Sequence, residues 1–364
     1  MIKYTIGIDV ASKDVKACFG SIDIHQKFKI HSTRTFANST SALPKFVDWI
    51  AKLQKLKDLP LRVCMEATGV YHERYAMHLQ QEGFEVSIVL PNRSKKYFAA
   101  LGMKSKNDKI DAIGLAKMAA QQDLMIWTPA SKFFYTLRKL TRQRQSIQEY
   151  KTTLKGKIHA EKASAHPEEI VLNQLIQHEE MLKKQLKNID VQIEQHLKKD
   201  PQVYQKVKNI EKIKGVSTVT VSVIIAETFG FELFKNAKQL ISYAGYDVVE
   251  NQSGKRSGKT RISKKGNPRI RRVLHLPAFS VVRFDNHQFK TFFYRILGQH
   301  HIKMKAYVAV QKKLLTTIFA LWKKNEAYDE YYNLITNDNY KNSKKQSLDM
   351  NIETSPDKLQ PQCA

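Results

Sequence analysis

The chain has 364 residues, enough for two or three domains, and 42% of them are hydrophobic, so a sizeable core is possible. It holds 61 lysines and arginines against 34 aspartates and glutamates, and the net charge of +27 predicts a polyanionic partner, either nucleic acid or an anionic membrane. No apolar run approaches the roughly 18 residues of a transmembrane helix, and Asp9 interrupts the stretch where a signal peptide would be apolar. We therefore expect nucleic acid, and no membrane, as the partner.

The cysteines and histidines show no metal-binding pattern. Cys18, Cys64 and Cys363 are widely spaced and form no C-x-x-C pair, so neither a zinc ribbon nor a disulfide framework is expected. The 12 histidines include no H-x-x-x-H pair, the spacing of two zinc ligands on one helix. The cysteine usage favours the reducing cytoplasm as the compartment.

Residues 1–125 predict an α/β domain. Short apolar or alternating runs predict strands in the segments YTIGID, DVKACFGSI, KFKIHSTRTF, LRVCME and FEVSIVLP, the last of which ends at a proline. Helical spacing of apolar residues predicts helices over residues 41–56, in GVYHERYAMHLQQEG and in NDKIDAIGLAKMAAQQ, where Asn107 is a plausible N-cap. The expected element order is βββαβαβα.

The remainder of the chain predicts helices. Over residues 131–200, Leu182, Leu186, Ile189, Ile193 and Leu197 form a seam that suits a coiled coil or a helical hairpin, with a break at SAHPEE. A linker and a dimerisation arm are both open interpretations of this region. Residues 205–330 predict a second compact unit, in which IEKIKGVSTVTVSVII resembles a phosphate-binding helix-hairpin-helix or is an ordinary packed helix pair. The polar C-terminal residues predict a disordered tail.

Four carboxylates fall at positions where a sheet domain binds its ligand. Asp9 and Glu66 lie at the carboxyl ends of the first and fourth predicted strands, the edge at which open α/β sheets bind ligands. Asp108 and Asp111 lie three residues apart, on one face at the start of a predicted helix. Each alone could be a turn, surface or capping residue. Together they predict a catalytic site with two Mg²⁺ ions about 4 Å apart, the arrangement that clamps the attacking and leaving oxygens in phosphoryl transfer.

Basic residues cluster in two places that suit backbone phosphates. Residues 253–272 hold nine lysines and arginines and no acidic residue, although a solvated basic loop would have the same composition. SGKRSGKT in this segment is not a Walker A motif, because three rather than four residues separate Gly254 from Gly258. The candidate nucleic-acid contacts are Lys104, Lys106, Lys109, Lys255, Arg256, Lys259, Arg261, Lys264, Lys265, Arg269, Arg271 and Arg272.

The segments GIDVASK, MEATGVY and KNDKIDA resemble the DEDD motifs of bridge-RNA-guided insertion-sequence transposases, relatives of the Piv/MooV DNA invertases. In the C-terminal half, IKGVSTVTVSVIIAETFG, AKQLISYAGYDVVENQSGK and RISKKGNPRIRRVL match the family in order, and the resemblance covers about residues 4–320. It implies an RNase H-like (RuvC-like) catalytic domain at 1–125, a helical coiled-coil region at 126–204 and a mainly α transposase domain at 205–335, before a tail at 336–364.

The resemblance also implies an activity. The chain would be a serine recombinase-like transposase, with Ser253 of QSGK as the nucleophile on DNA and Asp9, Glu66, Asp108 and Asp111 holding Mg²⁺ in the same composite site. A structured non-coding guide RNA would pair with donor and target DNA, and the protein would act as a dimer or tetramer in the cytoplasm, at the nucleoid of a bacterium or archaeon. From the residues alone, a Ser-Gly pair is usually a turn, and Ser257 is a second candidate.

Other functions fit parts of the sequence. A site-specific DNA invertase or a RuvC-like nuclease would share the carboxylates, and a degenerate relative would only bind nucleic acid. An ATP-dependent sugar kinase also carries IGID on its first strand, but it would need a second phosphate loop and an adenosine-binding Gly-Gly, and neither is found.

Overall fold

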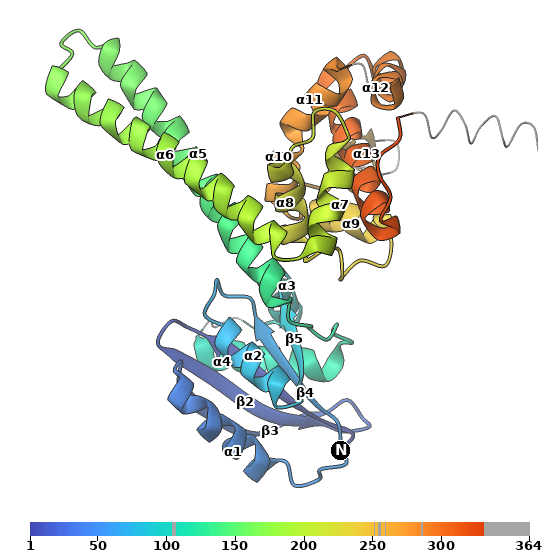
Figure 1. Cartoon of the computed structure of the whole chain (residues 1–364). Coiled ribbons are helices and arrows are strands. Elements are labelled where there is room, and N and C mark those ends of the chain that lie inside the picture. The colour runs from blue at the N-terminus through green and yellow to red at the C-terminus, as the bar shows by residue number, and fades with distance from the viewer. Residues whose placement is uncertain (104–106, 251, 254–255, 259, 285–286, 331–364) are drawn as a thin grey trace, which may run out of the picture. The chain divides into compact units, whose positions relative to one another are not determined.

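The computed structural model describes residues 1–103, 107–250, 252–253, 256–258, 260–284 and 287–330 (Figure 1). Lys104, Lys106, Lys255, Lys259 and the predicted tail at 336–364 lie outside the described residues. The chain divides into two compact units, Met1–Pro129 and Ala130–Ala364. None of the described helices is long and apolar enough to cross a membrane.

A mixed sheet forms the centre of the first unit. Its strands are β1 (Lys3–Val10), β2 (Asp14–Ile22), β3 (Phe28–Ala37), β4 (Leu61–Glu66) and β5 (Glu85–Val89). The spatial order is β3-β2-β1-β4-β5, in which β1 to β3 are an antiparallel meander and β4 and β5 run parallel to β1. This is the topology of an RNase H-like domain, so the predicted strands and the predicted fold class are confirmed.

Helices cover both faces of the sheet. Helices α1 (Leu43–Leu53) and α2 (Glu73–Gln81) bury Phe46, Trp49 and Tyr75 against one face. Helix α4 (Asp108–Gln121) covers the other face and begins at the predicted cap, where the Asn107 side chain accepts a hydrogen bond from the Ile110 amide. A helix that was not predicted, α3 (Pro91–Ala100), lies between β5 and α4. In the sequence pattern Pro91 marks only the end of a strand, whereas in the structure it occupies the first turn of this helix, where proline is favoured.

Helix α4 packs against β1 at backbone distance because position 7 has no side chain. A Cβ atom at Gly7 would collide with the Ala112 carbonyl oxygen and the Ala116 amide nitrogen of α4. In the strand register, Gly7 lies between Cys18 of β2 and Cys64 of β4, both of which are buried free thiols. The Gly7 contact therefore fixes α4, with its aspartates, against β1, the strand that carries Asp9 next to its last residue.

The second unit begins with a long helical hairpin. Helices α5 (Lys132–Lys162) and α6 (Glu169–Lys198) pack side by side (Figure 1), and the predicted break around Pro167 separates them. From the predicted seam, Leu186, Ile193 and Leu197 are buried. The hairpin alternative is thus the one that the chain adopts, with the two helices as each other's partners.

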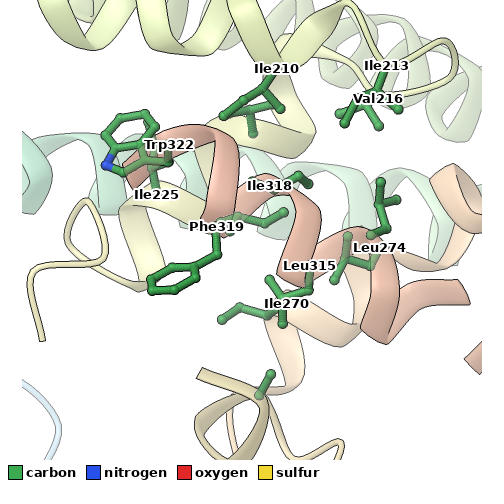
Figure 2. Packing of buried hydrophobic residues seen from close by; sticks show 14 of the residues in the cluster. Ile210, Ile213, Val216, Ile225, Ile270, Leu274, Leu315, Ile318, Phe319 and Trp322 are labelled. Carbon is green, nitrogen blue, oxygen red and sulfur yellow. The ribbon is translucent and has the colours of Figure 1, made fainter. Parts of the chain in front are cut away.

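The remaining helices enclose one core. They are α7 (Pro201–Glu211), α8 (Thr218–Glu227), α9 (Ala237–Ala244), α10 (Pro268–Val273), α11 (His275–Arg283), α12 (His287–His300) and α13 (Lys303–Lys324). Figure 2 shows side chains from different helices meeting there, among them Ile225 of α8 and Ile318 and Trp322 of α13. Two small ladders, β6 (Val248–Val249) with β9 (Arg261–Ile262) and β7 (Gln252–Ser253) with β8 (Arg256–Ser257), precede α10. The expected helical C-terminal region is confirmed.

The close packing at Gly7 predicts a large effect of its replacement. Gly7→Ala should lower the free energy of unfolding by about 2 kcal/mol or more, because backbone atoms of α4 must move to admit the methyl group. The control is Gly156→Ala in the interior of α5, where nothing lies within 4 Å and alanine should be neutral or stabilising by up to about 1 kcal/mol. Chemical denaturation of the full chain measures both, and equal midpoints for the two variants would contradict this packing.

Candidate active site

The four predicted carboxylates line one cavity of the first unit, with a volume of about 690 Å³. Asp9 and Glu66 reach it from the ends of the adjacent parallel strands β1 and β4, whose register pairs Ile8 with Met65. Asp108 and Asp111 reach it from the first turn of α4. Helix α3 supplies much of the remaining wall. The sheet topology and the Gly7 contact thus bring together residues that are about 100 positions apart in the sequence.

The negative charges of this cavity raise the pKa of Asp9. Its pKa is raised to about 6, first because burial penalises the charged carboxylate and then because Asp108, Asp111 and Glu66 repel it. A cation placed among these side chains would remove that penalty. The raised pKa is a common feature of functional sites, where charges are arranged for a ligand rather than for stability.

Lys16 of β2 contacts one of these carboxylates, a partner that the sequence pattern does not indicate. Its Nζ atom donates a hydrogen bond to Asp108 Oδ2 at 2.7 Å, and the β1–β2 register places Lys16 opposite Asp9. This contact lowers the pKa of Asp108 and raises the pKa of Lys16. Lys16 therefore neutralises one of the carboxylates that surround Asp9.

Ser94 of α3 is the second residue that was missed. Its side chain is fully buried, and its hydroxyl donates a hydrogen bond to Glu66 Oε2 at 2.5 Å. A buried donor of this kind fixes the direction in which the carboxylate presents its other oxygen. Pro91, three positions before Ser94, is a sequence signal for the start of the helix that carries this serine.

The donor set suits a hard divalent cation. All four side chains offer carboxylate oxygens, the ligands that Mg²⁺ prefers, and the raised pKa of Asp9 reports negative charge that a cation would balance. In the described residues, however, no three histidine, cysteine, aspartate or glutamate side chains are already grouped closely enough to hold one ion. A cation held by three or more of these carboxylates would therefore require the side chains to move closer together.

The candidate nucleophile belongs to the second unit. The backbone of Ser253 lies in the β7–β8 ladder, where it pairs with Arg256, and Ser257 pairs with Gln252. The four carboxylates belong to the first unit.

The basic candidates differ in what they contact. Arg261, Lys264 and Lys265, like Lys109 in the first unit, are exposed, whereas the arginines of α10 make contacts within the protein. Arg271 donates hydrogen bonds to the carbonyl oxygens of Ala244 at 2.7 Å and Lys264 at 3.1 Å. The remaining two pair with acidic residues, Arg272 with Glu149 and Arg269 with Glu227.

The segment that resembles a helix-hairpin-helix is a packed helix pair with its own acidic residue. A turn at Gly215, whose φ is +95°, joins α7 to α8. The Glu211 carboxylate accepts hydrogen bonds from the Thr218 hydroxyl at the start of α8 and from Lys208. A carboxylate at this place repels a phosphate, so the ordinary helix pair is the better interpretation of this segment.

Profiles of known families match both units. A profile for IS110 DEDD transposases matches residues 6–167, and a profile described as "Transposase IS116/IS110/IS902 family" matches residues 207–294. The pilin gene-inverting proteins of Moraxella bovis and Moraxella lacunata are each 28% identical over 332 residues, which cover 91% of this chain and 99% of the relative.

Solved structures resemble a smaller part of the chain. Thermus thermophilus RuvC aligns with a TM-score of 0.25 and 12% identity, over 31% of this chain and 90% of that protein. The Holliday junction resolvase of fowlpox virus aligns with a TM-score of 0.23 and 11% identity, over 31% and 93%. The two matching profiles, in chain order, show that the chain carries IS110-family DEDD transposase domains, which are domains of DNA-processing enzymes.

Proposed function

We propose that this protein is the recombinase of an insertion sequence, which cuts and rejoins DNA with a magnesium-binding carboxylate site and a serine nucleophile. The observation that carries the proposal is the cavity in which Asp9, Glu66, Asp108 and Asp111 meet. Support also comes from the two family matches and from the net charge of +27, which suits a polyanionic substrate.

In this proposal the four carboxylates hold up to two Mg²⁺ ions, which would stabilise the charge that develops on the scissile phosphate. Ser94 keeps Glu66 in its orientation through the 2.5 Å hydrogen bond. Lys16 balances Asp108 until ligands enter, and it then carries a positive charge beside the phosphate. One side of the cavity is apolar and includes Phe98 and Met103.

Ser253 acts as the nucleophile in this proposal. Its hydroxyl oxygen forms an ester bond with a backbone phosphorus, the bond from that phosphorus to a deoxyribose oxygen breaks, and the serine proton ends on the leaving oxygen. Attack by a second DNA strand's hydroxyl on the phosphoserine reverses these steps and rejoins the DNA. The cycle needs no external energy source, because each phosphodiester bond that breaks is replaced by another ester.

We further propose a structured guide RNA, a dimer or tetramer, and action at the nucleoid in the cytoplasm of a bacterium or archaeon. Site-specific DNA inversion is the second candidate function. It is favoured by the similarity to the pilin gene-inverting proteins, which extends over 91% of this chain. Both functions use the same cutting and joining chemistry and differ in the arrangement of the DNA sites.

If the carboxylates hold the metal, a change in one of them should impair DNA cleavage and leave DNA binding intact. Asp111→Asn should reduce Mg²⁺-dependent strand cleavage about 100-fold or more, because it removes a charged ligand, while DNA affinity stays within about twofold. Asp123→Asn is the matched control, since Asp123 follows the far end of the same helix and lies outside the cavity. Cleavage and gel-shift assays on one DNA substrate measure both, and unaltered cleavage by Asp111→Asn would refute the metal site.

The pKa of Asp9 predicts a pH-dependent stability. The pKa is raised to about 6 in the folded protein from 3.8, so the folded state binds this proton more tightly than the unfolded state does. The resulting stabilisation is complete below about pH 4 and is lost as the pH rises through 6. Without divalent ions, Asp9→Asn should therefore melt a few degrees above the wild type at about pH 7.5 and at the same temperature at about pH 4. A difference that does not change with pH would contradict this assignment.

If Ser253 is the nucleophile, the protein should form a covalent adduct with DNA through this residue. Ser253→Ala should eliminate an SDS-resistant protein–DNA complex, because the methyl group cannot form an ester with phosphorus. Ser257→Ala is the matched control, since Ser257 lies in the same β7–β8 ladder and is also followed by glycine. Denaturing gels of labelled DNA measure the adduct, and its persistence in Ser253→Ala together with its loss in Ser257→Ala would reassign the nucleophile.

A further inference from the structure

Helix α3 forms one wall of the carboxylate cavity. It follows β5, and its first turn begins at the proline that ends that strand. Four of its residues line the cavity, at spacings that place them on one helical face: Pro91, Lys95, Phe98 and Ala99. A ligand that enters the cavity therefore meets this face of α3 as well as the carboxylates.

Contacts with two neighbouring elements hold α3 in place. The fully buried Ser94 donates its hydrogen bond to Glu66 Oε2 of β4 at 2.5 Å. The Phe98 ring packs on α4 at Gly114, where a Cβ atom would lie 2.5 Å from an atom of the ring. The backbone at Lys95 is thus fixed against the two elements that carry Glu66 and the aspartates of α4, and only its side chain is free to move.

Lys95 is the basic residue of this wall. Among the described residues that line the cavity, it alone is a lysine or an arginine. The ammonium group of Lys16 is held by Asp108 at 2.7 Å. Lys95 is exposed and, within the described part of the chain, forms no hydrogen bond or ion pair through its side chain. Its ammonium group is therefore available to a ligand.

A DNA strand brings negative charge into a cavity that is already negative. The four carboxylates repel the backbone, and two Mg²⁺ ions would balance no more than their charge. The phosphates on either side of the scissile one still require a cation. A lysine that is not paired with the carboxylates can bind such a phosphate without competing for the metal. Its compact charge on a flexible stem suits a phosphate better than a fixed planar ligand.

We infer that Lys95 binds a phosphate next to the scissile one and so positions the DNA strand in the cavity. The inference rests on the proposed function, which supplies the DNA and its scissile phosphate. It adds a DNA contact outside the basic segment 253–272. The contact is made equally before and during the reaction, so its loss should weaken binding without slowing the bound complex.

The test compares Lys95→Gln with Lys96→Gln, both in the full chain. Lys96 is the next residue of the same helix, is also exposed, and does not line the cavity. Both changes remove one positive charge, so they alter the net charge equally. Fluorescence anisotropy in EDTA, over a range of salt concentrations, measures the affinity for a labelled DNA duplex and for a labelled single-stranded RNA without cleavage.

For Lys95→Gln we expect an affinity for the duplex that is about three- to tenfold weaker than that of the wild type. The log–log salt slope should fall by about 0.9, the value for one lost phosphate contact on duplex DNA. Lys96→Gln should match the wild type in both respects. With saturating DNA and Mg²⁺, Lys95→Gln should cleave within about twofold of the wild-type rate.

A second measurement locates the contact on the DNA. Neutral methylphosphonates replace the phosphates around the cleavage position one at a time. At the phosphate that Lys95 binds, the replacement should weaken the wild type about three- to tenfold and leave the affinity of Lys95→Gln within about twofold. The position of this coupling gives the register of the strand in the cavity.

Equal losses in Lys95→Gln and Lys96→Gln would overturn the inference and leave an effect of net charge only. A loss confined to the RNA, or no coupled phosphate beside the cleavage position, would overturn it as well. Unchanged DNA affinity with a lower Mg²⁺ requirement for cleavage would make Lys95 a counter-charge of the carboxylates instead. If the wild type cleaves no DNA, the proposed function fails, and the comparison in EDTA still decides whether Lys95 binds a DNA phosphate.

Discussion

The candidate active site depends on the distance between one helix and one strand. Helix α4 can carry Asp108 and Asp111 to Asp9 only because Gly7 leaves room for the helix backbone on β1. The same approach concentrates negative charge in a partly buried place, which raises the pKa of Asp9. The close packing of α4 on β1 and the repulsion among the aspartates thus have one cause, the short distance between the helix and the strand. A cation is the kind of ligand that would relieve this repulsion.

Much of this domain follows from local sequence signals. Apolar runs predicted each strand of the sheet, and the Asn107 cap predicted where α4 begins. Helix α3 was missed because a proline after a strand fits both a strand end and the first turn of a helix, and no strong apolar period decided between them. The carboxylates could be selected from the sequence because strand ends and helix starts are local features.

The partners of the carboxylates could not be selected in this way. Lys16 contacts Asp108 across 92 positions, and Ser94 contacts Glu66 across 28. Arg142 meets Glu227 across 85 positions. It lies in a region whose sequence predicts only a coiled coil or a helical hairpin, serving as a linker or a dimerisation arm. A lysine, a serine or an arginine on a surface strand or helix is common, and only the tertiary fold shows which of them faces a carboxylate. The role of Arg271 in binding main-chain carbonyl oxygens was hidden for the same reason.

Two cysteines, Cys18 and Cys64, flank Gly7 at the centre of the first unit. Burial raises the pKa of Cys18 and of Cys64 to about 12, so almost no reactive thiolate exists at neutral pH. Both thiols are fully buried at the centre of the sheet, where peroxide and alkylating reagents cannot reach them without unfolding. These two thiols should therefore react only when the first unit unfolds, so their alkylation can serve as a direct measure of its unfolding.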